Sequence, residues 1–229
     1  MDVEKYARWN KLIITKVSAQ KRPGRYNVFI DGKYAFSAGE KTLAEFVLLK
    51  GKELNDEQVE KIRQFDADAK ASDLAAHFLS YEPRTIFEVL QYLKKHEISD
   101  EAANSAVSQL NELGYLDDRQ YAKLFIKNDL RVGSDGPKIL LRKLTQKGVD
   151  PEISQDKLDE IDEEDWLEVG QRVIKSMSHQ VGKISQRELE RKMRTKLLTH
   201  GFDSGISNVI IDAMDLKEDE NAQTEALKK

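Results

Sequence analysis

The sequence predicts a mainly α-helical protein: three tandem three-helix repeats in an elongated curved array, preceded by a small N-terminal β unit with helices. Two observations carry this prediction. The helix-ending motif at Leu93 returns at Leu144 and at Leu197, with spacings of 51 and 53 residues. Ahead of the first copy, apolar and polar residues alternate along short segments that are separated by turn residues.

The N-terminal unit, residues 1–54, contains three predicted strands and one predicted helix. Residues 13–17 are mostly β-branched and apolar, "KRPG" is a turn, and "RYNVFI" alternates its side chains. Asp31 and Gly32 are a strong hairpin signal leading into "KYAFS". The segment "EKTLAEFVLLKGKEL" from residue 40 predicts a helix that Gly51 ends, and "NDEQ" at residues 55–58 has the form of a capping box for the next helix.

The repeats are defined by positions that match in all three copies. Five residues after each leucine comes an apolar residue, and the next residue is a good helix N-cap. Further apolar positions match at spacings close to those of one helix face. The matching sets are Val89, Leu140 and Met193; Leu93, Leu144 and Leu197; Ile98, Val149 and Phe202; Ser99, Asp150 and Asp203; Ala102, Ile153 and Ile206; Val107, Leu158 and Ile211; and Leu110, Ile161 and Met214.

Start signals place the boundaries of the repeats. Thr85 with Glu88, and Ser185 with Glu188, have the form of capping boxes for the middle helices of the first and third repeats. Gly136 precedes a proline at the start of the middle helix of the second repeat. In each repeat, a further helix is predicted before the middle helix and the capped helix that follows it. We therefore predict repeats at residues 55–116, 117–164 and 165–216, followed by a polar tail at 217–229. Such units stack and bury faces that one unit alone could not bury.

The composition excludes several classes of protein. There is no cysteine, so disulfides, thiolate metal sites and cysteine nucleophiles are excluded. No apolar run approaches the roughly 20 residues that span a bilayer, and the start has no signal-peptide core. The sequence also lacks a phosphate-binding loop and the zinc-protease and serine-hydrolase motifs. We therefore expect a cytoplasmic monomer without enzymatic activity, cofactor, metal or membrane contact.

Charge is strongly segregated along the chain, although the net charge is only −4. Residues 119–147 and residues 172–196 each carry 8 basic and 2 acidic residues. Between them, residues 150–165 carry 9 acidic residues and one lysine, which predicts an exposed join between repeats. Basic helix faces of this kind can contact phosphates or an acidic protein groove. The alternative is that they are solvated surfaces.

Three segments together resemble one known family. They are "FLSYEPRTIFEVLQYL", "LNELGYLDDRQYAKLFI" and "GPKILLRKLTQKGV", and their order closely resembles the RecX family, which modulates the RecA recombinase. The segment from "ITKVSAQKRPG" to "LLKGKEL" resembles the extended N-terminal region of Gram-positive members, so the resemblance covers roughly residues 10–214. Glu82 departs from the family pattern, where a basic residue is common, and so do Leu141 and Arg142.

The resemblance implies regulation by binding. A RecX-like protein would bind the RecA filament on single-stranded DNA and inhibit its ATPase and strand exchange, modulating recombination, DNA repair and the SOS response. Single-stranded DNA inside the filament is a further expected contact. The alternative is a helical-repeat nucleic-acid-binding module that acts without RecA. Tight binding to bare single-stranded DNA would favour that alternative.

The candidate contact residues are basic side chains. Arg187, Arg191 and Arg194 have spacings that place them on one helix face, and Lys138 and Arg142 are four residues apart. Arg84 resembles an arginine of the family, with a cap or a pair with Glu88 as the alternative. The full set is Arg84, Arg131, Lys138, Arg142, Lys143, Lys147, Arg187, Arg191, Lys192, Arg194 and Lys196. Arg22 and Arg25, beside the first turn, are additional candidates for contact with DNA.

Overall fold

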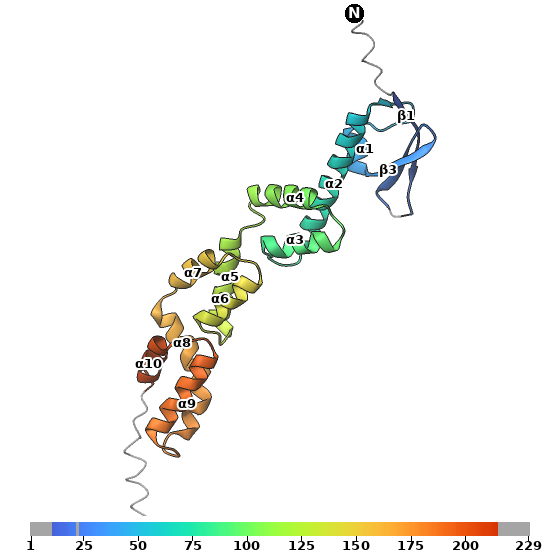
Figure 1. The fold of residues 1–229 in the computed structure, drawn as a ribbon. Coiled ribbons are helices and arrows are strands. Elements are labelled where there is room, and N and C mark those ends of the chain that lie inside the picture. The colour runs from blue at the N-terminus through green and yellow to red at the C-terminus, as the bar shows by residue number, and fades with distance from the viewer. Residues whose placement is uncertain (1–10, 22, 215–229) are drawn as a thin grey trace, which may run out of the picture. The chain divides into compact units, whose positions relative to one another are not determined.

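The computed structural model describes residues 11–21 and 23–214, which form two compact units divided between Leu116 and Asp117 (Figure 1). The first unit contains β1 (Leu12–Ala19), β2 (Arg25–Ile30), β3 (Lys33–Gly39), α1 (Glu40–Glu45), β4 (Glu53–Leu54), α2 (Asp56–Leu79), α3 (Ile86–Lys95) and α4 (Asp100–Glu112). The second contains α5 (Asp118–Val132), α6 (Pro137–Gln146), α7 (Pro151–Asp159), α8 (Glu163–Ile174), a 3₁₀ segment (Lys175–Gln180), α9 (Gln186–Thr199) and α10 (Ser204–Asp212). Among the described helices, none has the length and apolar character needed to cross a membrane.

The N-terminal sheet is antiparallel, with strand order β3-β2-β1-β4. The predicted hairpin turn is confirmed, because Asp31 and Gly32 have φ angles of 50° and 80° between β2 and β3. The fourth strand, β4, was not predicted. It has only two residues, which pair with Leu12 and Ile13, and a strand so short shows no alternation in the sequence.

The predicted helix over residues 40–51 is wrong in its extent, because α1 ends at Glu45. Val47 lies in the left-handed region with φ 45°, and the next residue, Leu48, is buried in the core under the sheet. Gly51 has φ 92° and donates its N–H to the Ile14 carbonyl at 2.7 Å. Burial of Leu48 and this bond to β1 therefore replace two further turns of helix.

Helix α2 belongs to two hydrophobic cores of the first unit. It begins at the predicted capping box, in which Asn55 accepts the N–H of Gln58 and the Gln58 side chain accepts the N–H of Asn55. Ile62, near its start, packs in the core of the sheet. Ala71 and Ala75, further along, pack with α3 and α4. The sheet and the first three-helix repeat therefore share one continuous helix.

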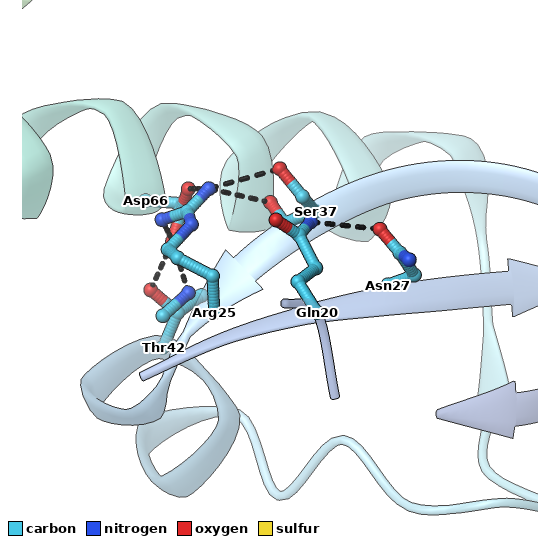
Figure 2. A network of polar contacts seen from close by, with 7 residues as sticks. Gln20, Arg25, Asn27, Ser37, Thr42 and Asp66 are labelled. Atoms are coloured by element: carbon cyan, nitrogen blue, oxygen red, sulfur yellow. Dashed lines mark hydrogen bonds and ion pairs between the residues drawn. The ribbon is translucent and has the colours of Figure 1, made fainter. Parts of the chain in front are cut away.

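Asp66 on α2 ties this helix to the sheet through a buried polar network (Figure 2). One carboxylate oxygen, Oδ1, accepts from the N–H of Gly39 at 2.7 Å, from Thr42 Oγ1 at 2.9 Å and from Arg25 Nη1 at 3.1 Å. The other oxygen pairs with Arg25 Nη2 at 2.9 Å. Arg25 is therefore held inside the unit and does not fit the role of a free DNA contact; Arg22 lies outside the described residues.

The predicted fold of three-helix repeats is confirmed, and the three leucines that define the repeats are fully buried. Each middle helix ends in the same way, with the N–H of the apolar residue bonded to the carbonyl of the leucine five residues earlier. The three bonds run from Ile98 to Leu93 at 3.2 Å, from Val149 to Leu144 at 3.1 Å and from Phe202 to Leu197 at 3.1 Å. The residue before each apolar one is left-handed: Glu97 (φ 59°), Gly148 (φ 83°) and Gly201 (φ 87°). This is the Schellman arrangement, repeated three times.

The helix starts in the repeats are also confirmed. Ser99, Asp150 and Asp203 each accept a backbone N–H from the first turn of the following helix. Thr85 and Ser185 do the same for the middle helices α3 and α9. The first repeat has a core of its own, whereas the second and third share one core that contains Leu144, Trp166, Leu197 and Phe202.

Replacing Glu97 by glycine is expected to stabilise the first repeat. A left-handed conformation costs a residue with a side chain about 1 kcal/mol, and glycine occupies the equivalent position in the other two repeats. Amide hydrogen exchange in α3 and α4 of Glu97→Gly should slow by about fivefold. The matched reverse change, Gly148→Ala, should accelerate exchange in α6 and α7; unchanged exchange in both variants would contradict the assignment.

Candidate binding surface

Helix α6 begins where α9 ends, within the second unit (Figure 1). Gly136 caps α6 without a side chain, and Pro137 occupies its first turn. The N–H of Gly136 donates to the His200 carbonyl at 2.6 Å, and the N–H of Lys138 donates to the Gly201 carbonyl at 3.1 Å. N–H groups at the start of α6, which have no partner inside their own helix, therefore donate to carbonyls that follow α9.

Two glycines allow this close approach. A Cβ atom at Gly136 would lie 2.7 Å from the backbone nitrogen of Phe202, and one at Gly201 would lie 2.8 Å from that of Ile139. The ring of His200 adds a contact, because its Nδ1 lies 2.9 Å from the Ser134 carbonyl oxygen. Backbone contacts thus fix α6 and α9 relative to each other, and the residues that they carry are fixed with them.

Five of the predicted residues lie exposed on these two helices, and we name them the basic face: Lys138, Arg142, Arg187, Arg191 and Arg194. Both helices bury their opposite sides, which carry Leu140 and Met193 among others, in the same core. Within the described parts of the chain, no hydrogen bond or ion pair joins the side chains of these five residues to another group. The basic face therefore presents fixed charges that are open to solvent.

The other predicted residues are engaged within the chain. Arg84 forms an ion pair with Glu82, and its guanidinium lies 4.4 Å from the centre of the Phe78 ring, while Glu88 closes the capping box with Thr85. The remaining contacts are Arg131 with Asn128 at 3.2 Å, Lys143 with Asp135, Lys147 over the Tyr121 ring at 5.7 Å, Lys192 with Glu188 at 3.2 Å, and Lys196 with Ser176 at 2.9 Å. These six side chains already make contacts within the chain, so they are less available to bind a ligand than the five side chains of the basic face.

Lys143 belongs to a cluster that closes the end of α5. Arg172 of α8 donates to the Gly133 and Leu130 carbonyls, both at 2.8 Å. Asp129 accepts the N–H of Asp135 at 3.2 Å, and burial of its carboxyl group raises the pKa of Asp129. Arg172 thus satisfies carbonyls at the end of α5, and Lys143 pairs with the Asp135 carboxylate beside them, so both side chains have a structural role.

The acidic segment at residues 150–165 lies on α7 and at the start of α8. Glu163, Glu164 and Asp165 occupy the first turn of α8, where the helix dipole favours negative charge. Asp156 pairs with Arg119 at 3.7 Å, and a hydrogen bond from Lys157 lowers the pKa of Glu160. Placement at helix starts and pairing with lysine and arginine account for these acids without a ligand.

A second row of cations was not singled out from the sequence. Lys123 and Lys127 on α5 continue the spacing of four residues to Arg131, and this spacing is the signal that would have identified them. The three side chains line a groove of about 840 Å³ together with Glu160, Asp165, Glu168 and several apolar residues. Because acids line the same groove, its charge is mixed, unlike that of the basic face.

The chemistry available on this surface is recognition of charge. Over residues 11–21 and 23–214, no three His, Asp or Glu side chains gather as a metal ion would require. The guanidinium groups of the basic face can each form paired hydrogen bonds with a phosphate or a carboxylate. A polyanionic partner is the ligand class that suits this arrangement.

Comparisons with known proteins connect the whole fold to one family. The family model described as regulatory protein RecX N-terminal domain matches residues 12–55, and the model of the RecX first three-helix domain matches residues 71–110. A regulatory protein RecX from Lactobacillus gasseri is 54% identical over 217 residues, which cover 95% of this chain and 80% of that protein. The one from Bacillus subtilis is 32% identical over 216 residues, which cover 94% and 82%.

Two solved structures give the same result. One is described as the crystal structure of regulatory protein RecX, with a TM-score of 0.69 and 32% identity; the match covers 88% of this chain and 99% of that one. The other, RecX from Lactobacillus salivarius, has a TM-score of 0.63 and 28% identity, and the match covers 66% and 99%.

Proposed function

Because this chain belongs to the RecX family of regulatory proteins, we propose that it binds the RecA filament on single-stranded DNA and inhibits its ATPase and strand-exchange activities. RecA is proposed as the partner because the sequence resembles a family that modulates RecA. The structural observation that supports the proposal is the basic face, a set of five exposed cations without partners in the described chain. Its charge suits a filament whose DNA carries a phosphate on every nucleotide.

The geometry of the basic face fits an extended anionic partner. On α9, seven residues separate Arg187 from Arg194, so the three arginines extend about 10 Å along the helix. They lie on one side of α9 at spacings of four and three residues, so they can contact successive groups of one strand or one acidic protein groove. Lys138 and Arg142 are exposed on α6, whose start is bonded to the residues that follow α9, so they belong to the same unit as the three arginines.

The repeated architecture supports binding to a repeating partner. Three similar modules can each make a weak contact, and contacts to successive protomers of a filament add through effective concentration. Inhibition by binding requires no reaction pocket, which agrees with the lack of nucleotide-hydrolysis motifs in the sequence. We therefore propose stoichiometric action, with regulation set by how much of the filament is covered.

Selective binding tests this proposal against the alternative of a nucleic-acid module that acts without RecA. Labelled protein should bind RecA filaments on single-stranded DNA at least about tenfold more tightly than the same DNA alone, in the same physiological salt. Filaments formed with a non-hydrolysable ATP analogue keep the partner intact during the measurement. Equal affinity for the two would favour the module that acts without RecA, and no binding to filaments would refute the proposal.

A further inference from the structure

The two edges of the N-terminal sheet differ in how their backbone groups are satisfied. On the outer edge of β3, the Ala35 carbonyl accepts from Arg63 at 2.8 Å and the Ser37 carbonyl accepts from Arg25 at 3.3 Å. The N–H of Gly39 donates to Asp66 at 2.7 Å. Side chains therefore occupy the groups that another strand would need, and this edge is protected.

The edge of β1 is covered only at its beginning. β4 pairs with Leu12 and Ile13, and the adjoining loop bonds Ile14 through Gly51 and Lys52. Beyond Ile14, the register with β2 places Ala19 opposite Tyr26, and the N–H of Gln20 bonds the Arg25 carbonyl at 2.8 Å. Antiparallel bonding alternates, so the backbone groups of Val17 and Ala19 face away from β2. Nothing in the described residues bonds to them.

An apolar groove lies beside this open edge. It has a volume of about 740 Å³ and lies between β1 and the segment that contains α1 and the loop after it. Val17, Leu43, Ala44, Leu48 and Leu49 supply its apolar lining. Leu49 in this lining is 64% exposed, and Val47 in the same loop is 58% exposed. An added strand would direct alternate side chains into this groove.

The charges of the groove favour an acidic occupant. Two exposed lysines, Lys16 and Lys50, belong to its lining, against one carboxylate, Glu40, which accepts a hydrogen bond from Tyr26 at 3.2 Å. The Lys16 ammonium lies 5.5 Å from the centre of the Phe29 ring and keeps its charge there. A second copy of this chain is a poorer occupant, because antiparallel pairing of two β1 edges would bring the lysines of both copies together. An extended segment that alternates apolar and acidic residues can bond to the backbone of the edge, place its apolar side chains in the groove and pair its acidic side chains with the lysines.

We propose that the open edge of β1 is a strand-addition site for an extended acidic peptide segment of a partner protein, held by the backbone of Val17 and Ala19. In such sites, main-chain bonds supply affinity and side-chain pockets supply specificity. The site lies in the first unit, on residues other than the basic face. It goes beyond the proposed binding of RecA filaments and does not depend on it.

Peptide binding by the full-length protein tests this site. The probe is a short fluorescein-labelled peptide of alternating valine and glutamate, and the charge control alternates valine and lysine. The protein should bind the acidic peptide at least about tenfold more tightly than the basic one. Ala19→Pro removes only an outward N–H, since proline is tolerated on an edge strand, and should weaken binding by about tenfold. Ala19→Ser keeps that N–H and should bind as the unaltered protein does.

The far-UV circular dichroism spectrum shows whether Ala19→Pro keeps its fold. A second variant tests the site if the proline disturbs the strand. Lys16→Glu with Lys50→Glu should reverse the preference, so that the lysine peptide binds better than the glutamate peptide. No binding of the acidic peptide, or equal binding by Ala19→Pro in a folded state, would overturn the proposal. So would sedimentation that shows a dimer which Ala19→Pro dissociates, because the occupant would then be a second copy.

Discussion

Reversing the three arginines of α9 is expected to weaken binding to RecA filaments on single-stranded DNA by at least about a hundredfold. Arg187→Glu, Arg191→Glu and Arg194→Glu change exposed side chains that form no internal ion pair in the described structure, so the fold should remain. Each lost contact with a phosphate of a single strand lowers the salt dependence by roughly 0.7, so log affinity against log salt should flatten by about two. Titration of labelled filaments at several salt concentrations measures both effects.

A charge-matched variant separates a specific face from net charge. Lys61→Glu, Lys94→Glu and Lys95→Glu reverse three exposed lysines in the first unit and change the net charge equally. This control should lose less than about threefold in affinity, because the three lysines are not part of the basic face and exposed charges outside a contact are screened by salt. If it loses as much as the α9 variant, or if the α9 variant binds normally, the basic face is not the contact surface.

Replacing Asp66 by alanine is expected to have the largest effect on stability, about 3 kcal/mol in the N-terminal sheet. The carboxylate is buried and serves three donors, namely Arg25, Gly39 and Thr42. Its removal leaves the half-buried guanidinium of Arg25 without its counter-charge and leaves two further donors unpaired. Amide exchange of β2 and β3 should accelerate by about a hundredfold in Asp66→Ala, as measured by mass spectrometry of peptides from residues 25–39.

The amide variant provides the control. Asp66→Asn keeps an acceptor oxygen toward Gly39 and Thr42 but loses the ion pair with Arg25, so its exchange should be intermediate. The α9 and α10 amides should be unchanged in both variants, because they belong to the other unit. Unchanged exchange in β2 and β3 of Asp66→Ala would show that the network does not hold the sheet to α2.

Sequence patterns predicted the repeats because their signals are local. A helix end needs a left-handed residue and an apolar residue that bonds back over five positions, and these fall within one short segment at Leu93, Leu144 and Leu197. The caps at Ser99, Asp150 and Asp203 depend on residues two or three positions away. Such signals were sufficient to place most helices and the order of the repeats.

Features that depend on distant contacts were not predictable from those patterns. Helix α1 stops early because Leu48 is buried against the sheet, and β4 exists because it pairs with the start of β1. The meeting of α9 with α6 relies on Gly136 and Gly201, whose roles emerge only from backbone atoms across the fold.

The candidate site shows the same limit. Spacing placed Arg187, Arg191 and Arg194 on one face, and they lie exposed as that spacing requires. Spacing did not indicate which other cations would be engaged. Lys143 is paired with Asp135 and Lys196 with Ser176, a residue twenty positions earlier in the chain. Whether a lysine is free for a partner is decided by its tertiary neighbours, which a local pattern does not contain.

ATP hydrolysis by RecA on single-stranded DNA, titrated with this protein, is the measurement that tests the proposed function most directly. The account predicts that hydrolysis falls progressively as the protein approaches the filament in molar amount. The three-arginine variant of α9 should require far more protein for the same inhibition. Hydrolysis that remains unchanged at a molar excess of folded, unaltered protein would contradict the account.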